Sequence, residues 1–544
     1  MRMKKTRRIL ALIIVCLMVV SVASCKDGGS DNSTAGAQTG NSGGSAANSP
    51  DNSGNSGNSG SGSNSTESTT PTRKISIQVT QDSGSLHPLG NTSGYLLAMN
   101  ALYEPLLDTR EDGSRIWILA TGIDYIDDIH GILHIRPGVT FSNGNKLTAE
   151  DVMFTMNMHA ANPQMALNVK VVDFEKTKII DDYTIDLWYT EYNAAQEVAF
   201  GQMVIMDEES YDEVELSLHP IGTGPYVLVD YVINSHADVT AREDYWGEPP
   251  AVKDIRFKVI NEDAQVINAL EVGDIDITNI PITDVDFVKS LGYDVQEYGT
   301  GYYYATMFSM EPGNPLDTKE ARYAVCHAID RQSIADILFN GLSSVLDYPV
   351  SHNLLDFEPR FLNMHETYSI GYNPDKAKEL AERSGLVGKT VRIISNGTSI
   401  FDTIAEMVQY NLQEIGIDAQ IIRYDQATYF GTLMNASNYE IAIFNPIAPS
   451  RLACDILAMY FTFMPLGWEG PDRDRYMQYA MGALTTYDEA KRSELLYDAL
   501  GIFVDFTPWY GICEAIQVRA LAKDLKPLEI YLGSSFYAGL VSFK

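Results

Sequence analysis

The chain has 544 residues, of which 45% are hydrophobic and 10% aromatic, so it is long enough and apolar enough to form several folded units. Its 72 acidic residues outnumber its 39 basic residues and give a net charge of −33 at pH 7. A chain of this charge is repelled by phosphate backbones and by anionic lipid surfaces. This composition excludes wholesale disorder and argues against nucleic acid as a partner.

The first 24 residues predict an export signal. Five basic residues lie among the first eight, and residues 9–20 are all apolar. This apolar run is shorter than the roughly 20 residues that a membrane-spanning helix needs. It ends at Val22-Ala23-Ser24-Cys25, which resembles the bacterial lipobox. The resemblance implies that Cys25 carries lipid and anchors the protein at the outer face of the cytoplasmic membrane. A plain signal peptide followed by a chance cysteine is the alternative.

Residues 25–73 are predicted to be the lipidated cysteine and a disordered tether, because residues 26–73 consist almost entirely of Gly, Ser, Asn, Asp, Thr and Ala. The root-mean-square reach of such a chain is roughly 35–40 Å. Three cysteines follow the tether, at Cys326, Cys454 and Cys513. They allow one disulfide at most and imply no disulfide framework.

From residue 74 onward, the hydrophobic pattern alternates between the strand period and the helix period. It predicts strands at residues 75–79, 183–189 and 255–259, and helices that start after Thr148, Thr318 and Asn373. Residues 390–424 read as strand, helix and strand, which predicts a parallel βαβ unit. The expected fold class is therefore α/β.

The folded part shows no pattern typical of a catalytic site, so we expect no catalytic residue, no cofactor and no metal. Residues 222–226 superficially resemble a nucleotide-binding loop, but Pro225 would prevent the helix entry that such a loop requires. A turn before a strand at residues 226–229 is the better interpretation. His352 and His365 are the nearest pair of histidines, and we expect them in surface loops rather than in a zinc site.

Short blocks follow one another along the folded part of the chain. They read SLHPL (85–89), LYEPLL (102–107), LHIRPGVTFSNG (133–144), LTAEDV (147–152), PIGTGPY (220–226), YWG (245–247), LEVGDID (270–276), AIDR (328–331) and YNPDKA (372–377). In this order they resemble the family 5 extracellular solute-binding proteins, the oligopeptide-, dipeptide- and nickel-binding components of ABC importers. Most blocks read as turns or helix caps, so we expect them to be fold signatures rather than ligand contacts.

The resemblance implies a two-lobed periplasmic-binding-protein-like fold of the class II (cluster C) type, with an extra subdomain in the first lobe. Lobe I is expected at residues 74–299 and 512–544, with the subdomain at about residues 108–220. Lobe II is expected at residues 300–511. The two lobes of such a protein close on the ligand like a hinge.

The resemblance also places the ligand contacts, by position alone. The expected contacts are Thr92 and Ser93 in a first-lobe loop, Tyr302, Tyr303 and Tyr304 at the first crossover, Phe444 and Asn445 in the second lobe, and Trp509 and Tyr510 at the return crossover. Side chains alternate between the two faces of a strand, so one or two of the three consecutive tyrosines can reach a ligand. Ordinary strand propensity is the competing explanation for these tyrosines.

Asn445 departs from the pattern of the peptide-binding members. Those members tend to carry an aspartate four residues before a proline, and this aspartate pairs with the α-amine of the peptide. Counting back from Pro449 places Asn445 at that position. An amide lacks the charge that a desolvated ammonium group needs, so recognition of a free peptide amine is in doubt.

The expected function is that of a monomeric, lipid-anchored substrate-binding protein that passes a peptide or similar small solute to an ABC permease and its ATPase. Two alternatives remain open: a sensory or adhesive surface lipoprotein on the same fold, and an exported hydrolase, which only size and export favour. The sequence does not name the solute, which is open among peptides, nickel complexes, sugars and opines.

Overall fold

The computed structural model describes residues 73–544, apart from residues 83, 90–95, 347–349, 363, 365–369, 449, 465 and 533–535. The predicted signal peptide, Cys25 and residues 26–72 of the predicted tether lie outside the described residues, and so do Thr92, Ser93 and His365. Within the described residues, none of the helices combines the length and the apolar composition needed to cross a membrane.

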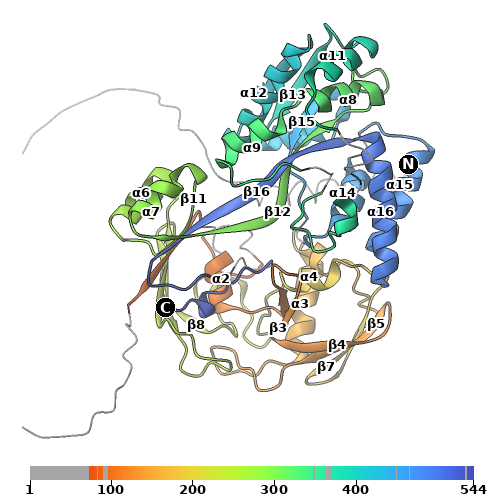
Figure 1. Ribbon diagram of the computed structural model, residues 1–544. Coiled ribbons are helices and arrows are strands. Elements are labelled where there is room, and N and C mark those ends of the chain that lie inside the picture. The colour runs from red at the N-terminus through yellow and green to blue at the C-terminus, as the bar shows by residue number, and fades with distance from the viewer. Residues whose placement is uncertain are drawn as a thin grey trace, which may run out of the picture. The chain divides into compact units, whose positions relative to one another are not determined.

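Among the described residues, ten strands form one mixed sheet, in the order β14-β13-β15-β12-β16-β11-β1-β10-β9-β8. In chain order their bounds are β1 Ile75–Val79, β8 Tyr226–Val232, β9 His236–Ala241, β10 Asp254–Val259, β11 Ile277–Ile280, β12 Asp294–Phe308, β13 Thr390–Ser395, β14 Asp418–Arg423, β15 Ile441–Phe444 and β16 Trp509–Leu521. β12 and β16 are antiparallel neighbours in the middle of this order, and Figure 1 shows them as two long strands that run side by side.

A smaller four-stranded antiparallel sheet has the order β4-β5-β7-β6, and two short strands, β2 and β3, form a separate pair. Their bounds are β2 Leu107–Thr109, β3 Arg115–Trp117, β4 Ala120–Asp127, β5 His130–Ile135, β6 Lys178–Asp181 and β7 Thr184–Trp188. The strands predicted at residues 75–79, 183–189 and 255–259 are confirmed as β1, β7 and β10.

The helices of the described residues are α2 Leu96–Leu102, α3 Ala149–Ala161, α4 Gln196–Phe200, α5 Glu213–Leu218, α6 Asp263–Glu271, α7 Val285–Ser290, α8 Lys319–Ala328, α9 Arg331–Phe339, α11 Pro374–Arg383, α12 Ser399–Glu414, α13 Gln426–Leu433, α14 Ala453–Phe463, α15 Pro471–Leu484 and α16 Glu489–Phe506. Short 3-10 helices occupy Ala166–Val169, Ile282–Asp284, Pro359–Phe361, Ala436–Asn438 and Ala538–Leu540. In Figure 1 the long helices α15 and α16 lie side by side.

The predicted helix starts are confirmed at the atomic level. The Thr148 side chain accepts a hydrogen bond from the Glu150 backbone, and the Asp151 carboxylate accepts one from the Thr148 backbone, so α3 starts with a complete capping box. The Thr318 and Asn373 side chains cap α8 and α11 by accepting a hydrogen bond from the backbone of Ala321 and of Lys376. The predicted βαβ unit is also confirmed, because β13 and β14 pair in parallel with α12 between them in the chain.

The buried hydrophobic side chains that the structure describes divide into one large core and three smaller ones. The large core is built by residues between 303 and 513, whereas the other three are built by residues 75–288 and 518–543. β12 and β16 connect the two groups: Val295 packs against one of the smaller cores, and Tyr303, eight residues further along β12, belongs to the large core. On β16 the corresponding change occurs between Cys513 and Val518.

The pairing of β12 with β16 is interrupted where the cores change. Gly299 pairs with Ile516 and Tyr303 pairs with Glu514, so residues 300–302 form a bulge opposite Ala515. The Thr300 hydroxyl donates a 2.9 Å hydrogen bond to the Ala515 carbonyl, and Gly301 adopts φ +72°, a conformation that favours glycine. This crossover bulge (residues 300–302) is therefore an ordered feature of the strand pair.

Candidate functional site

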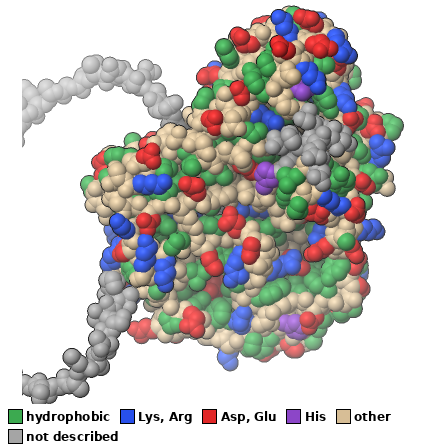
Figure 2. Space-filling view, viewed as in Figure 1, with side chains coloured by type: hydrophobic (Ala, Val, Ile, Leu, Met, Phe, Trp, Pro, Cys, Tyr) green, Lys and Arg blue, Asp and Glu red, His purple; other side chains and the backbone are tan. Residues whose placement is uncertain are grey.

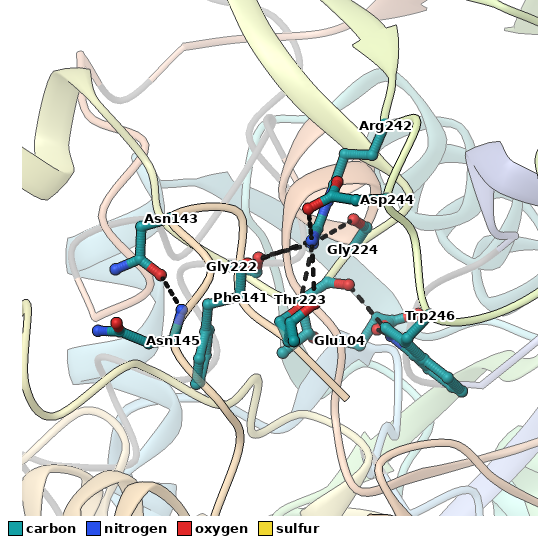
Figure 3. A network of polar contacts seen from close by, with 11 residues as sticks. Glu104, Phe141, Asn143, Asn145, Gly222, Thr223, Gly224, Arg242, Asp244 and Trp246 are labelled. Atoms are coloured by element: carbon teal, nitrogen blue, oxygen red, sulfur yellow. Dashed lines mark hydrogen bonds and ion pairs between the residues drawn. The ribbon is translucent and has the colours of Figure 1, made fainter. Parts of the chain in front are cut away.

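Several of the sequence blocks meet in one buried network, shown in Figure 3. Its centre is Glu104, which lies two residues after the end of α2 at Leu102 and is 4% exposed. The Tyr245 hydroxyl donates a 2.7 Å hydrogen bond to one carboxylate oxygen of Glu104, and the Trp246 indole nitrogen donates a 3.0 Å bond to the other. Burial raises the pKa of Glu104 to about 7, although these hydrogen bonds and the charge of Arg242 act in the opposite direction.

The Arg242 guanidinium forms hydrogen bonds with residues of two further blocks. It donates hydrogen bonds to the carbonyls of Phe141, at 3.1 Å, Gly222, at 3.4 Å, and Gly224, at 3.5 Å. A Cβ atom at Gly222 would lie 2.2 Å from the Leu102 carbonyl oxygen, so this close approach of two backbones requires glycine. The predicted turn before β8 is confirmed, and its glycines face protein backbone.

This network explains what four of the nine sequence blocks do, namely LYEPLL, LHIRPGVTFSNG, PIGTGPY and YWG. Their hydrogen bonds hold α2, the turn before β8 and the segment after β9 against one another, and each of these bonds joins two groups of the protein. The prediction that these blocks are fold signatures therefore agrees with the contacts.

Four of the predicted ligand contacts are core residues. Tyr303 is 0% exposed, and Phe444, Trp509 and Tyr510 are also buried in the large core. The indole of Trp509 stacks on Phe461, with 5.2 Å between the ring centroids and 7° between the ring planes. These four side chains belong to the large core, and their direct contact with a ligand stays a prediction.

Three other predicted contacts are partly exposed: Tyr302, Tyr304 and Asn445. Tyr302 and Tyr304 flank the buried Tyr303, as the alternation of side chains along a strand requires. Asn445 directly follows β15, which pairs with β12 in antiparallel fashion. The structure thus brings the first crossover and the segment of Asn445 onto neighbouring strands, and their role in ligand binding stays a prediction.

Two side chains that the sequence analysis did not single out crowd the crossover bulge. Arg451 approaches Gly301 so closely that a Cβ atom there would lie 3.0 Å from the Arg451 Cδ atom. Asn353 packs against Gly299 in the same way, at 2.7 Å. Both come from loops more than 50 residues away in sequence from the bulge, so no local pattern could have found them.

A buried carboxylate on β16 accepts hydrogen bonds from the loop that contains Asn353. Glu514 on β16 is 2% exposed and accepts hydrogen bonds from the Ser351 hydroxyl, at 2.5 Å, and from the His352 backbone, at 2.8 Å. The Nδ1 atom of His352 lies 3.2 Å from the same carboxylate. His352 is therefore a partner of the crossover and not merely a residue of a surface loop.

The part of the chain that the structure describes shows no sign of metal or disulfide chemistry. Among the residues that the structure describes, no group of three or more His, Cys, Asp or Glu side chains is placed to hold a metal ion. Cys326, Cys454 and Cys513 are all buried and free. On the face shown in Figure 2, acidic and basic side chains of the described residues are interspersed, unlike the continuous basic surface that nucleic-acid binding requires.

Comparison with known families matches residues 124–462 to the description "Bacterial extracellular solute-binding proteins, family 5 Middle". The chain belongs to this family. The resemblance expected from the sequence blocks is thereby confirmed, and the family places the protein outside the cell or in the periplasm.

Two relatives illustrate the range of the family. The nickel-binding periplasmic protein of Escherichia coli is 27% identical over 378 residues, which cover 64% of this chain and 70% of the relative. The dipeptide-binding protein of Pseudomonas aeruginosa is 23% identical over 80% of this chain and 88% of the relative. Both are named as binding proteins.

A solved structure confirms the two-lobed periplasmic-binding-protein-like fold. NikA from Brucella suis, solved in complex with Fe(III)-EDTA, matches with a TM-score of 0.76 at 18% identity. The match covers 87% of this chain and 100% of that protein. The fold of the family therefore accounts for nearly the whole of the folded part.

Proposed function

We propose that the protein is the substrate-binding component of an ABC importer, and that it captures a peptide or a similar small solute between two lobes and delivers it to the permease. The observation that carries this proposal is the passage of β12 and β16 from the large core to the smaller cores, in a chain of this family. Lobe I comprises residues 74–299 and 512–544, and lobe II comprises residues 300–511.

Closure of the lobes is the proposed mechanism. Hinges consist of a few residues that absorb a large change in φ and ψ. The crossover bulge suits this role, because it lacks regular pairing with β16 and contains the left-handed Gly301. A solute that contacts both lobes stabilises the closed state, and the permease distinguishes that state from the open one. The protein itself converts nothing chemically.

Tyr302, Tyr304 and Asn445 are the proposed direct contacts on the side of lobe II, since their side chains are partly exposed beside the crossover. Thr92 and Ser93 are the proposed contacts from lobe I. Aromatic rings and amide groups can bind peptides and other small polar solutes whether or not the solute carries a charge.

Attachment and assembly complete the proposal. Lipid on Cys25 would hold a monomer at the outer face of the cytoplasmic membrane, and residues 26–73 would let the folded part reach the permease. A sensory or adhesive role would need the same anchor but no permease. Uptake measurements on a strain that lacks this gene separate the two: loss of peptide or nickel uptake supports transport.

Small-angle scattering and tryptophan fluorescence test the closure directly. Native mass spectrometry of the full-length protein, purified from its source, first identifies the solute that copurifies with it. Saturation with this solute should reduce the radius of gyration and change the emission of Trp509, which lies on β16 at the return crossover. If a solute verified by native mass spectrometry changes neither signal, the hinge mechanism is wrong.

A further inference from the structure

Arg451 lies beside the crossover bulge in an unusual setting. It adopts φ +49°, which is uncommon for a residue with a side chain. Its carbonyl accepts a 2.9 Å hydrogen bond from the Leu355 backbone, and its own amide donates one of 3.0 Å to the Ala448 carbonyl. Two backbone hydrogen bonds thus hold Arg451 in a strained conformation that directs its side chain toward Gly301.

The guanidinium of Arg451 donates fewer hydrogen bonds than the guanidinium groups of the buried Arg322 and Arg331. Arg322 and Arg331 each donate to the carbonyls of three residues. Arg451 donates one long bond, 3.4 Å from Nη1 to the Gly299 carbonyl. Within the described part of the chain, no carboxylate lies within 4.0 Å of it, whereas a guanidinium carries five N–H donors.

The charges that surround Arg451 come from both lobes. Burial lowers the pKa of Arg451, while Tyr298 and Tyr302 on β12 and Asp108 and Glu111 in lobe I act in the opposite direction. Asp108 already accepts hydrogen bonds from the Tyr537 hydroxyl, at 2.9 Å, and from the Thr109 backbone. These carboxylates influence Arg451 from beyond ion-pair distance, so within the described residues they form no ion pair with its guanidinium.

We propose that Arg451 binds a carboxylate of the transported solute, at the point where the two lobes meet. Guanidinium and carboxylate groups form paired, charge-assisted hydrogen bonds. Asn445, six residues earlier, adds an amide and no charge to the same segment. The solute class is therefore one that carries a carboxylate and needs no free amine. This inference rests on the proposed function.

The carboxylate can belong to a peptide or to a metal chelate, and two probes separate these sources. The first probe is N-acetyl-trialanine, with a free carboxylate or with a C-terminal amide. The second is Fe(III)-EDTA, a polycarboxylate chelate. Calorimetry with the full-length protein should show that at least one of the two carboxylate probes binds. Where the peptide binds, its carboxylate form should bind at least tenfold more tightly than its amide form, and the difference should shrink with added salt.

Variants then assign the effect to the guanidinium. Arg451→Gln should lower the affinity for the carboxylate probe at least tenfold and leave any binding of the amide unchanged, and Arg451→Lys should retain part of the affinity. Arg475→Gln, which removes an exposed charge on α15, is the matched control and should bind as the wild type does. If Arg451→Gln does not fold, the proposal is tested by the ratio of the two affinities of the wild type, for the peptide carboxylate and for its amide.

The outcomes separate the two proposals. Equal affinity of Arg451→Gln and wild type for the carboxylate probe, or equal affinity of the wild type for the peptide carboxylate and its amide, overturns the role of Arg451 and leaves the proposed function standing. If the wild type binds neither carboxylate probe but does bind a neutral or cationic solute, the inferred solute class is wrong. If it binds no solute at all, the proposed function fails together with this site.

Discussion

The guanidinium carbon of Arg331 lies 4.4 Å from the centroid of the Tyr510 ring. The same guanidinium donates hydrogen bonds to the carbonyls of Leu346, Gly511, at 3.1 Å, and Ile370, at 3.4 Å. The Tyr510 hydroxyl donates a 2.5 Å bond to the Ile370 carbonyl as well. The arginine of the AIDR block thus fixes the start of β16, the strand that passes from the large core to one of the smaller cores.

Replacing Arg331 by Met should therefore destabilise the protein. Arg331 is 6% exposed, so the change leaves buried carbonyl groups without their donor. We expect the free energy of unfolding to fall by about 3 kcal/mol. Arg423, whose guanidinium is 47% exposed and pairs with Asp402 and Glu406, provides the matched control. Arg423→Met should cost less than about 1 kcal/mol in urea unfolding, and equal losses for the two variants would contradict this interpretation.

The raised pKa of Glu104 predicts how stability depends on pH. Its usual pKa of 4.5 applies to the unfolded chain, whereas burial raises the pKa to about 7 in the folded protein. Between these two values the folded state binds the proton more tightly, so stability from this group falls as the pH rises from 4.5 to 7. The total change is on the order of 3 kcal/mol.

Glu104→Gln removes this titration. The stability of the variant relative to the wild type should therefore increase from pH 4.5 to pH 7, as measured by chemical unfolding at a series of pH values. A pH-independent difference between the two proteins would show that Glu104 ionises with its usual pKa.

Gly301→Ala tests the crossover bulge. The alanine would have to adopt φ +72°, which is unfavourable for a residue with a Cβ atom. This Cβ atom would also lie 3.0 Å from the Arg451 side chain. We expect a loss of about 1–3 kcal/mol in unfolding free energy. Gly431 in α13 is the control, because a Cβ atom there meets nothing within 4 Å. Gly431→Ala should stabilise the protein by about 0.5–1 kcal/mol, since alanine favours the helix. A neutral Gly301→Ala would show that the bulge adapts without strain.

Asn445→Asp tests the group that recognises the solute. With the neutral amide, the protein should bind N-acetylated peptides at least as well as free-amine peptides. The aspartate should reverse this order, because a carboxylate pairs favourably with a desolvated ammonium group. Calorimetry should show a shift of roughly 2–5 kcal/mol. Tight binding of free-amine peptides by the wild type, lost on acetylation, would place the charge partner elsewhere.

Cys25→Ala tests the anchor. The variant should stay unprocessed or leave the membrane fraction, because diacyl modification of the cysteine supplies the two lipid chains that stable attachment requires. Fractionation and intact mass measure both effects. If the variant and the wild type have the same mass after processing and the same membrane distribution, the lipoprotein assignment is wrong.

The local elements of this protein were readable from the sequence. The capping box at Thr148, the helix start at Asn373 and the βαβ unit of residues 390–424 depend on residues close together in the chain, and each is present in the structure. The ordered blocks also identified the family, because each block encodes a turn, cap or close backbone approach of the fold.

The candidate site followed from the sequence only in part. The run of Tyr302, Tyr303 and Tyr304 marked the crossover, but the sequence did not tell which of the three is buried. Neither Arg451 nor Glu514 stands out in a chain with 39 basic and 72 acidic residues. Their settings arise from contacts between segments far apart in sequence.

The sequence by itself thus determined the α/β class, the helix caps and the family, because these depend on local spacing and on the order of short blocks. The tertiary structure alone decided that Arg451 lies against Gly301 without a described carboxylate partner, and that Glu514 is held by Ser351 and His352. Burial and the loss of water are properties of the packed chain, and they decide which of many similar charges can act on a ligand.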